Sequence, residues 1–146
     1  MKRNIALLFF LFSMACYAAP TALTPMFENY LALQAALAGD NLQDAVNAAK
    51  KMQTSIPEKA KDEKMSEQLS SISLLAKNIG AAKDLEQARK TFGEMSVLMI
   101  ALKSESGLSV SEYFCPMVKK SWLQKGDKVQ NPYFGKQMSG CGEKKS

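Results

Sequence analysis

The sequence predicts a mainly α-helical protein, an up-and-down four-helix bundle followed by an irregular C-terminal arm that can include a short β-hairpin. Apolar residues recur at three- and four-residue spacing through residues 20–104, which is the period of amphipathic helices. The breaks between these stripes are short, which predicts that neighbouring helices run antiparallel. After Ser104 turn-forming residues dominate, and four of the eight glycines fall between residues 126 and 142.

The first helix is expected to begin at Thr24, a capping residue, with Pro25 at the first helical position. Gly39 is expected to end it. Its predicted inner face is formed by Phe27, Tyr30, Leu31, Gln34 and Leu37.

The second helix is expected to be capped by Asp40, with Gln43 as the reciprocal residue of a capping box. Ile56 should stop this helix, because the residue before Pro57 disfavours helical geometry. A charged link over 58–64 then leads into a third helix, which Gly80 is expected to end.

The fourth helix is expected to be capped by Asp84, again with a glutamine, Gln87, three residues later. Apolar residues then alternate by three and four positions up to Leu102, a seam typical of bundle helices. Gly93 within the seam indicates a close contact with another element. Methionines on the helical stripes are expected to pack in the core.

The N-terminus predicts export. Residues 1–18 combine a basic start, an apolar run and small residues before a cut at Ala19, as in a secretory signal peptide. Residues 19–146 are then one helical domain with a Cys/Met arm over 105–146. The expected location is the periplasm, with no transmembrane span after signal removal. Lipidation at Cys16 is an alternative form of processing.

The composition limits the kinds of catalytic and metal-binding sites that the chain can form. The chain has 146 residues and no histidine, which excludes Ser-His-Asp and Cys-His catalysis and every histidine-based metal site. No enzymatic activity is expected. The net charge is +5, but the lysines are scattered among aspartate and glutamate over many segments. Nucleic acid is therefore not an expected partner.

Four sulfur-containing residues of the arm form the candidate site: Cys115, Met117, Met138 and Cys141. Cys115 precedes a proline and should be extended, and continued extension would place Met117 on the same side. A single turn across Ser139-Gly140 could bring Met138 and Cys141 together. Two thiolates and two thioethers make a soft donor set, which selects copper(I) over hard cations and suits it better than zinc.

A disulfide between Cys115 and Cys141 is the competing hypothesis. Two cysteines in an exported protein pair by default. In the chain-entropy model, closing this loop contributes about 3 to 4 kcal/mol. The protein would then be an interaction module whose arm is pinned to the helices, with no metal.

The arm also carries a resemblance. The pattern "CPM…WL…NPYFGxxMxxCG" is similar to the C-terminal signature of the domain-of-unknown-function 3347 family, a periplasmic domain found alone or attached to CusB/HlyD-type heavy-metal efflux adaptors. The helical segments "YLALQAALAGDNLQDAVNAAKKM" and "DLEQARKTFGEMS" also resemble this family. The matching arm residues are Cys115, Pro116, Met117, Trp122, Leu123, Asn131, Pro132, Tyr133, Phe134, Gly135, Met138, Cys141 and Gly142.

The resemblance implies export and an association with copper or silver handling. It makes the four sulfur residues candidate copper(I) ligands, and a heavy-metal efflux adaptor or copper-handling protein the expected partner. "YFCPM" separately resembles the start of the heavy-metal motif "YxCPMHP", from which this chain departs because Val118 replaces the histidine. The chain also lacks a glycine-containing insertion between Met117 and Trp122.

Overall fold

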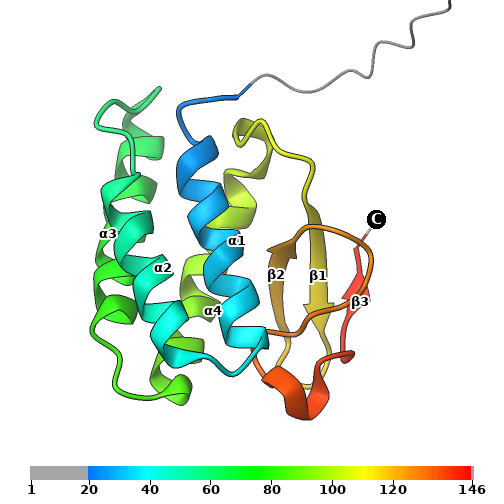
Figure 1. Cartoon of the computed structure of the whole chain (residues 1–146). Helices are drawn as coiled ribbons and strands as arrows, with labels where there is room; N and C mark the ends of the chain where they lie inside the picture. The colour runs from blue at the N-terminus through cyan, green and yellow to red at the C-terminus, as the bar shows by residue number, and fades with distance from the viewer. Residues whose placement is uncertain (1–19, 146) are drawn as a thin grey trace, which may run out of the picture.

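A computed structural model describes residues 20–145, so the predicted signal peptide and Cys16 lie outside the described residues. Four helices come first: α1 (Thr24–Ala38), α2 (Leu42–Thr54), α3 (Glu63–Gly80) and α4 (Leu85–Ala101). Consecutive helices pack side by side, and α1 also contacts α4. The predicted four-helix, mainly α fold is therefore confirmed (Figure 1).

The helix starts follow local capping rules, with two corrections. Asp62 and Asp84 accept hydrogen bonds from Met65 and Gln87 backbone N–H groups at the starts of α3 and α4. The prediction that Asp40 caps α2 is wrong, because Asn41 is the cap and accepts the N–H of Asp44. The chain adopts a left-handed conformation at Asp40, with φ of 58°, which frees its carboxylate for another contact.

The other correction concerns Thr24, which does not cap α1. It is the first helical residue, and its Oγ1 accepts the N–H of Thr21 at 2.7 Å and donates to the carbonyl of Ser106 at 2.8 Å. This hydroxyl joins the start of α1 to the segment that follows α4. The bundle and the beginning of the arm are therefore connected at this end.

The arm is more regular than the sequence predicts. After the short 3-10 helix η1 (Lys103–Glu105), β1 (Ser111–Cys115) and β2 (Lys120–Gln124) form an antiparallel hairpin. The short strand β3 (Glu143–Lys144) pairs with the other edge of β1, giving the order β2-β1-β3. The short β-hairpin predicted in the arm is present as β1 and β2, although the sequence did not locate β2. Its pairing partner lies across a turn that the local sequence does not specify.

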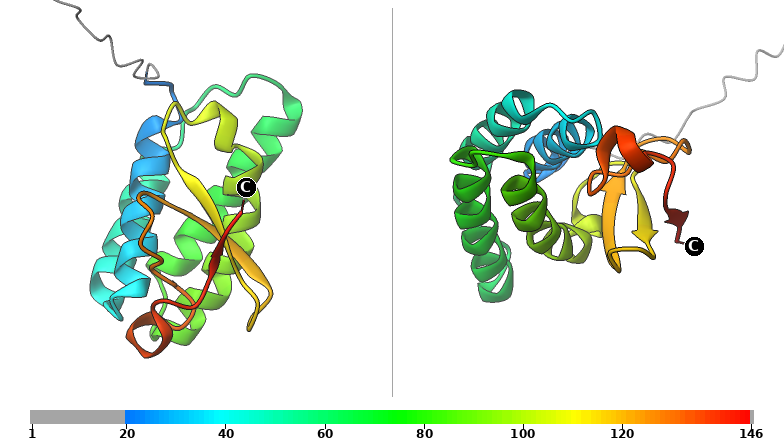
Figure 2. Two further views of the ribbon diagram at one scale, coloured as in Figure 1. Left: turned by 90° about the vertical axis from the view of Figure 1, so that its right-hand side faces the viewer. Right: turned by 90° about the horizontal axis from the view of Figure 1, so that it is seen from below.

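The sheet lies against the side of the bundle formed by α4 and α1, with β2 nearest the helices and β3 farthest (Figure 2). A chain of aromatic rings forms this interface. Tyr30 stacks on Phe92 at 5.2 Å between centroids, Phe92 meets Tyr133, and Tyr133 and Trp122 pack in a T-shaped pair. Each pair adds about 0.5–1.5 kcal/mol beyond its buried area.

Tyr30 also joins the helices to the sheet through its hydroxyl. Its oxygen lies 2.8 Å from the Ser96 hydroxyl and accepts the backbone N–H of Leu123 in β2 at 3.2 Å. Burial raises the pKa of Tyr30 far above its ordinary value, so the hydroxyl stays neutral. The position of β2 is therefore fixed by a polar contact as well as by apolar packing.

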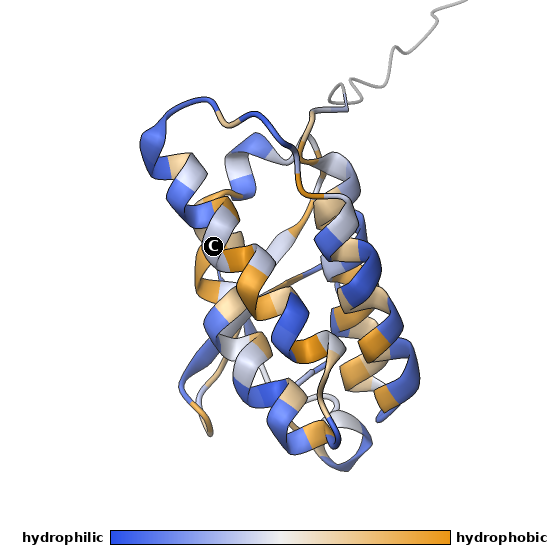
Figure 3. Ribbon diagram, turned by 90° about the vertical axis from the view of Figure 1, so that its left-hand side faces the viewer, coloured by the Kyte–Doolittle hydropathy of each residue, from blue (hydrophilic) through white to orange (hydrophobic). Residues whose placement is uncertain are grey.

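Hydrophobic and hydrophilic residues alternate along the helices (Figure 3), and the buried hydrophobic residues of all four helices belong to one core. The predicted core methionines Met52, Met65, Met95 and Met99 are all buried. Gly93 makes the predicted close contact, and its neighbour is the side chain of Lys120 on β2. Within residues 20–145 no helix combines the length and apolar character that crossing a membrane requires.

Candidate functional site

The structure brings the two cysteines of the arm together. Cys115 is the last residue of β1 and is fully buried, whereas Cys141 lies between η2 (Gly135–Met138) and β3 and is partly exposed. Their Sγ atoms are 3.6 Å apart, and both are free thiols. This is sulfur–sulfur contact without a covalent bond, which would need about 2.05 Å.

The two methionines, two and three residues from the cysteines in sequence, are exposed, and this exposed part of the candidate site is called its rim. The chain turns immediately after Cys115, so the expected extension to Met117 does not occur, and Met117 lies in the β1–β2 turn with 64% of its surface exposed. Met138 ends η2 and is 36% exposed. Its carbonyl accepts the N–H of Cys141 at 3.0 Å, which closes the turn expected across Ser139-Gly140.

The two thiols differ in their electrostatic surroundings. Burial raises the pKa of Cys115, but hydrogen bonds outweigh it and the net pKa lies below the ordinary value. The donors are the backbone N–H groups of Val118 and Met117, the Asn131 side chain and the Cys141 thiol. The pKa of Cys141 is raised, chiefly by its hydrogen bond to Cys115 and then by burial. The pair therefore favours a state in which Cys115 is the thiolate and Cys141 keeps its proton.

Asn131 organises the segment that carries Cys141, a role that sequence reasoning missed. Its Oδ1 accepts the N–H groups of Tyr133 and Phe134, and its Nδ2 donates to the carbonyl of Cys141 at 2.6 Å. Its own N–H donates to the carbonyl of Ser139. In the sequence, Asn131 was only one residue of the pattern that resembles the family. Asn131 is completely buried, which no local pattern reveals, so its amide bonds only to protein groups. These hydrogen bonds of Asn131 to residues 133, 134, 139 and 141 are called the Asn131 clamp.

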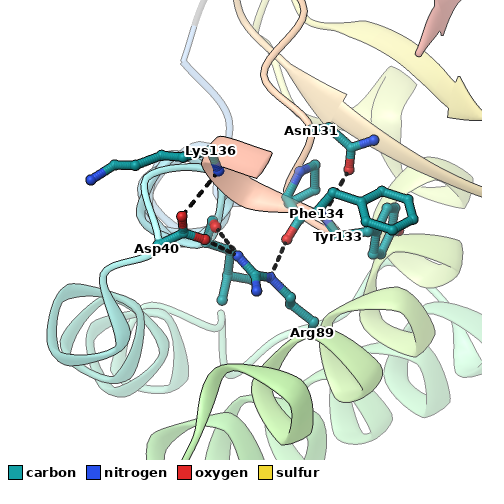
Figure 4. A network of polar contacts seen from close by, with 8 residues as sticks. Asp40, Arg89, Asn131, Tyr133, Phe134 and Lys136 are labelled. Atoms are coloured by element: carbon teal, nitrogen blue, oxygen red, sulfur yellow. Dashed lines mark hydrogen bonds and ion pairs between the residues drawn. The ribbon is translucent and has the colours of Figure 1, made fainter. Parts of the chain in front are cut away.

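A second polar network fixes the other end of the same segment (Figure 4). The Arg89 side chain of α4 donates to the Pro132 carbonyl at 2.9 Å, to the Leu37 carbonyl at 2.8 Å, and to the Asp40 carboxylate. The second Asp40 oxygen accepts the N–H of Lys136 at 3.0 Å. The hydrogen bond from Arg89 is the main reason that the pKa of Asp40 is lowered.

Gly135 is required where this network meets η2. Its φ of 58° is left-handed, and a Cβ there would collide with the Asp40 carboxylate and the Arg89 guanidinium. The Asn-Pro-Tyr-Phe-Gly stretch is therefore held between two bundle helices by Arg89 and joined to Cys141 by Asn131. This arrangement orders the arm without a cross-link between the cysteines.

The spacing of the sulfurs suits chelation. Two ligands of a tetrahedral site with metal–sulfur bonds of about 2.3 Å lie about 3.8 Å apart, close to the 3.6 Å between Cys115 and Cys141. The part of the chain that the structure describes holds no cluster of three or more His, Cys, Asp or Glu side chains. Among these four residue types, a metal on the pair would therefore have Cys115 and Cys141 as its ligands within the described residues.

Comparison with known proteins finds a similarity that lies mainly in the helical part of the chain. The family model described as "Protein of unknown function (DUF3347)" matches residues 26–111. No curated protein and no solved structure matches the chain. The match covers more than half of the chain, from α1 to the first residue of β1, and ends before Cys115. The chain belongs to this family of proteins of unknown function.

Proposed function

We propose that this chain is an exported protein that binds copper(I) or silver(I) through Cys115 and Cys141 and serves heavy-metal homeostasis or efflux. One observation carries the proposal: two free thiols from segments 26 residues apart in sequence meet at 3.6 Å, at a spacing compatible with two sulfur ligands of one metal. Thiolates are soft ligands, so the pair favours copper(I) over hard cations.

The surroundings of the pair support metal binding. A thiolate is the ligand form, and hydrogen bonds from Val118, Asn131 and Met117 favour the anion at Cys115. Binding would displace the remaining proton from Cys141. The buried sulfur holds the metal, while the exposed one offers access for delivery and removal.

The methionines complete the proposed site from the outside. Met138 adjoins Cys141 within one turn, and Met117 follows Cys115 in the hairpin turn. Both side chains are long, unbranched and exposed, so each can rotate towards the thiols without disturbing the core. A metal held in this way would remain at the surface, which suits transfer to a partner.

Export, a periplasmic location and an efflux adaptor or copper-handling protein as partner are further parts of the proposal. The apolar N-terminal run and the resemblance of the arm to efflux-associated domains support them. Cell fractionation with and without residues 1–18 tests the location. Recovery of the mature protein in the cytoplasmic fraction would remove the exported role.

Competition for copper(I) tests the site. The reduced, purified protein should take copper(I) from a coloured chelator in a one-to-one ratio. Cys115→Ser or Cys141→Ser should abolish competition, and Met138→Ala or Met117→Ala should weaken it about tenfold, or 1.4 kcal/mol. Met99→Leu is the matched control, because Met99 is buried in α4 and should leave the affinity unchanged.

The disulfide-pinned interaction module gives different results. An intact mass two units below the reduced value, with no copper(I) uptake after reduction, would establish that alternative and refute the metal site. If the thiols bind metal but both methionine variants match the wild type, the thioethers leave the proposal and the two-thiolate site remains.

A further inference from the structure

We propose that the Cys115–Cys141 pair carries out directional thiol–disulfide exchange, in which the sulfur of Cys141 receives the incoming thiolate and the sulfur of Cys115 leaves. This inference goes beyond metal binding and holds for the metal-free protein. It rests on the unequal exposure of the two sulfurs and on the donors that surround one of them.

Solvent exposure favours Cys141 as the sulfur that an external thiol attacks. Cys115 has no exposed surface, so whatever part of the pair an external thiol can reach belongs to Cys141. The residues that precede Cys141 from Lys136 to Gly140 are all exposed, and no atoms crowd the space beside Gly140. A thiol approaching the pair therefore meets Cys141 first.

The fold also supports departure of Cys115. In exchange, the leaving sulfur takes the electron pair of the broken bond, and donors that face it stabilise that charge. Cys115 is followed directly by the turn over 116–119, and the buried Asn131 side chain bonds the Cys141 carbonyl at 2.6 Å, so the polar groups of the turn and of Asn131 lie beside Cys115. The hairpin turn and the Asn131 hydrogen bonds hold these groups in place in the free-thiol form, which is the product of the exchange.

The reaction balances as follows. A thiolate of a small or protein thiol attacks Sγ of Cys141, the Cys115–Cys141 bond breaks, and Cys115 leaves as a thiolate. A second external thiolate then attacks the external sulfur that is bonded to Cys141, and Cys141 leaves as a thiolate. The two external thiols end as a disulfide, and two electrons have passed from them to the cysteine pair. The reverse reaction forms the Cys115–Cys141 disulfide from an external disulfide.

Trapping the mixed disulfide tests the direction. The metal-free wild-type full chain is oxidised with glutathione disulfide, exposed briefly to reduced glutathione, quenched with N-ethylmaleimide and mapped by peptide mass spectrometry, which resolves this pair from Cys16. We expect glutathione on Cys141 and maleimide on Cys115, in at least tenfold excess over the opposite pattern. The same treatment in denaturing urea should give both patterns equally, because the fold creates the difference.

Variants that keep one cysteine of the pair, each in a Cys16→Ser background, give an independent reading. Cys115→Ser, which keeps Cys141, should react with an aromatic disulfide reagent at least tenfold faster than Cys141→Ser, with circular dichroism confirming that both variants are folded. Glutathione on Cys115, equal labelling in the folded state, or failure of the intramolecular disulfide to form would overturn the inference. These outcomes are separate from copper(I) competition, so either proposal can fail while the other stands.

Discussion

The bundle, Thr24–Ala101, and the described part of the arm, residues 105–145, are built on different principles. Each bundle helix has its own apolar stripe, and three begin with a side-chain cap. The arm has strands of at most five residues, and its buried residues face helices far away in the sequence. The bundle can therefore be understood helix by helix, whereas the arm takes its structure from the bundle's surface.

The two regions also differ in what they carry. The family match ends at residue 111, so membership rests on the helices and the first strand residue. The free thiols, the Asn131 clamp and the exposed methionines all lie beyond it. Residues 103–145 hold eight lysines and four acidic residues, whereas residues 20–102 hold nine basic and ten acidic residues. The scaffold and the candidate chemistry thus occupy different parts of one chain.

The largest expected effect comes from removing the ring that joins the two regions. Phe92→Ala should lower the free energy of unfolding by about 3–5 kcal/mol, because Phe92 is fully buried between Tyr30 and Tyr133. Trp122, the only tryptophan, reports on the arm by fluorescence, and circular dichroism at 222 nm reports on the helices.

Urea unfolding followed by both probes should show one shifted transition. Val97→Ala is the control, since Val97 is 67% exposed on the same helix and should change stability by less than about 0.5 kcal/mol. Loss of the Trp122 signal well before the helical signal, in the wild type, would instead divide the protein into independently stable regions.

A smaller effect is expected where Asp40 joins η2 to the bundle through Arg89 and the Lys136 N–H, a contact called the latch. Gly135→Ala should destabilise the protein by about 2–4 kcal/mol, because left-handed geometry and a collision with the Asp40–Arg89 pair add together. Gly126→Ala separates these causes, since its φ is also positive but its surroundings are open.

Gly126→Ala should therefore cost only about 1–2 kcal/mol, and Gly140→Ala, which has neither feature, should be nearly neutral. Thermal unfolding of the three variants checks the order. Equal stability of Gly135→Ala and Gly140→Ala would show that Gly135 is not in close contact with Asp40 and Arg89.

The smallest effect is a pH dependence. The pKa of Asp40 is lower in the folded protein because of Arg89, so its contribution is present above the unfolded pKa of about 3.9 and is lost as pH falls through the folded value. Asparagine tolerates the left-handed backbone at this position, so Asp40→Asn removes mainly the charge.

The gap in urea midpoint between wild type and Asp40→Asn should be present at pH 6 and should close as the pH falls below 4. Asp127→Asn is the control, because Asp127 pairs with Lys144 on the open surface and should leave the midpoint unchanged. A gap that is independent of pH would mean that the Asp40 charge does not hold the latch.

Sequence reasoning predicted most of the bundle because helix signals are local. The Asp84 cap, the end of α3 at Gly80 and the burial of the methionine stripes all follow from spacing within one turn or a few turns. Thr24 and Asp40 were the two exceptions, because both bond to distant segments. The role of Asp40 as an ion-pair partner depends on Arg89, which lies on α4.

At the candidate site, the sequence identified the four sulfur residues but not their arrangement. The structure brings Cys115 and Cys141 together and leaves Met117 and Met138 at the rim, because the chain turns at Pro116 where extension was expected. The Asn131 clamp was not predictable, since its partners are backbone groups whose positions exist only after folding.

By itself, the sequence determined the helical scaffold, the absence of histidine chemistry and the restriction of candidate ligands to sulfur. Only the tertiary structure decided that β2 pairs with β1, that one thiol is buried and the other accessible, and which donors face Cys115. The physical reason is range: periodicity and capping act over a few residues, whereas burial and the pKa of a thiol are set by groups that only the folded chain brings into contact.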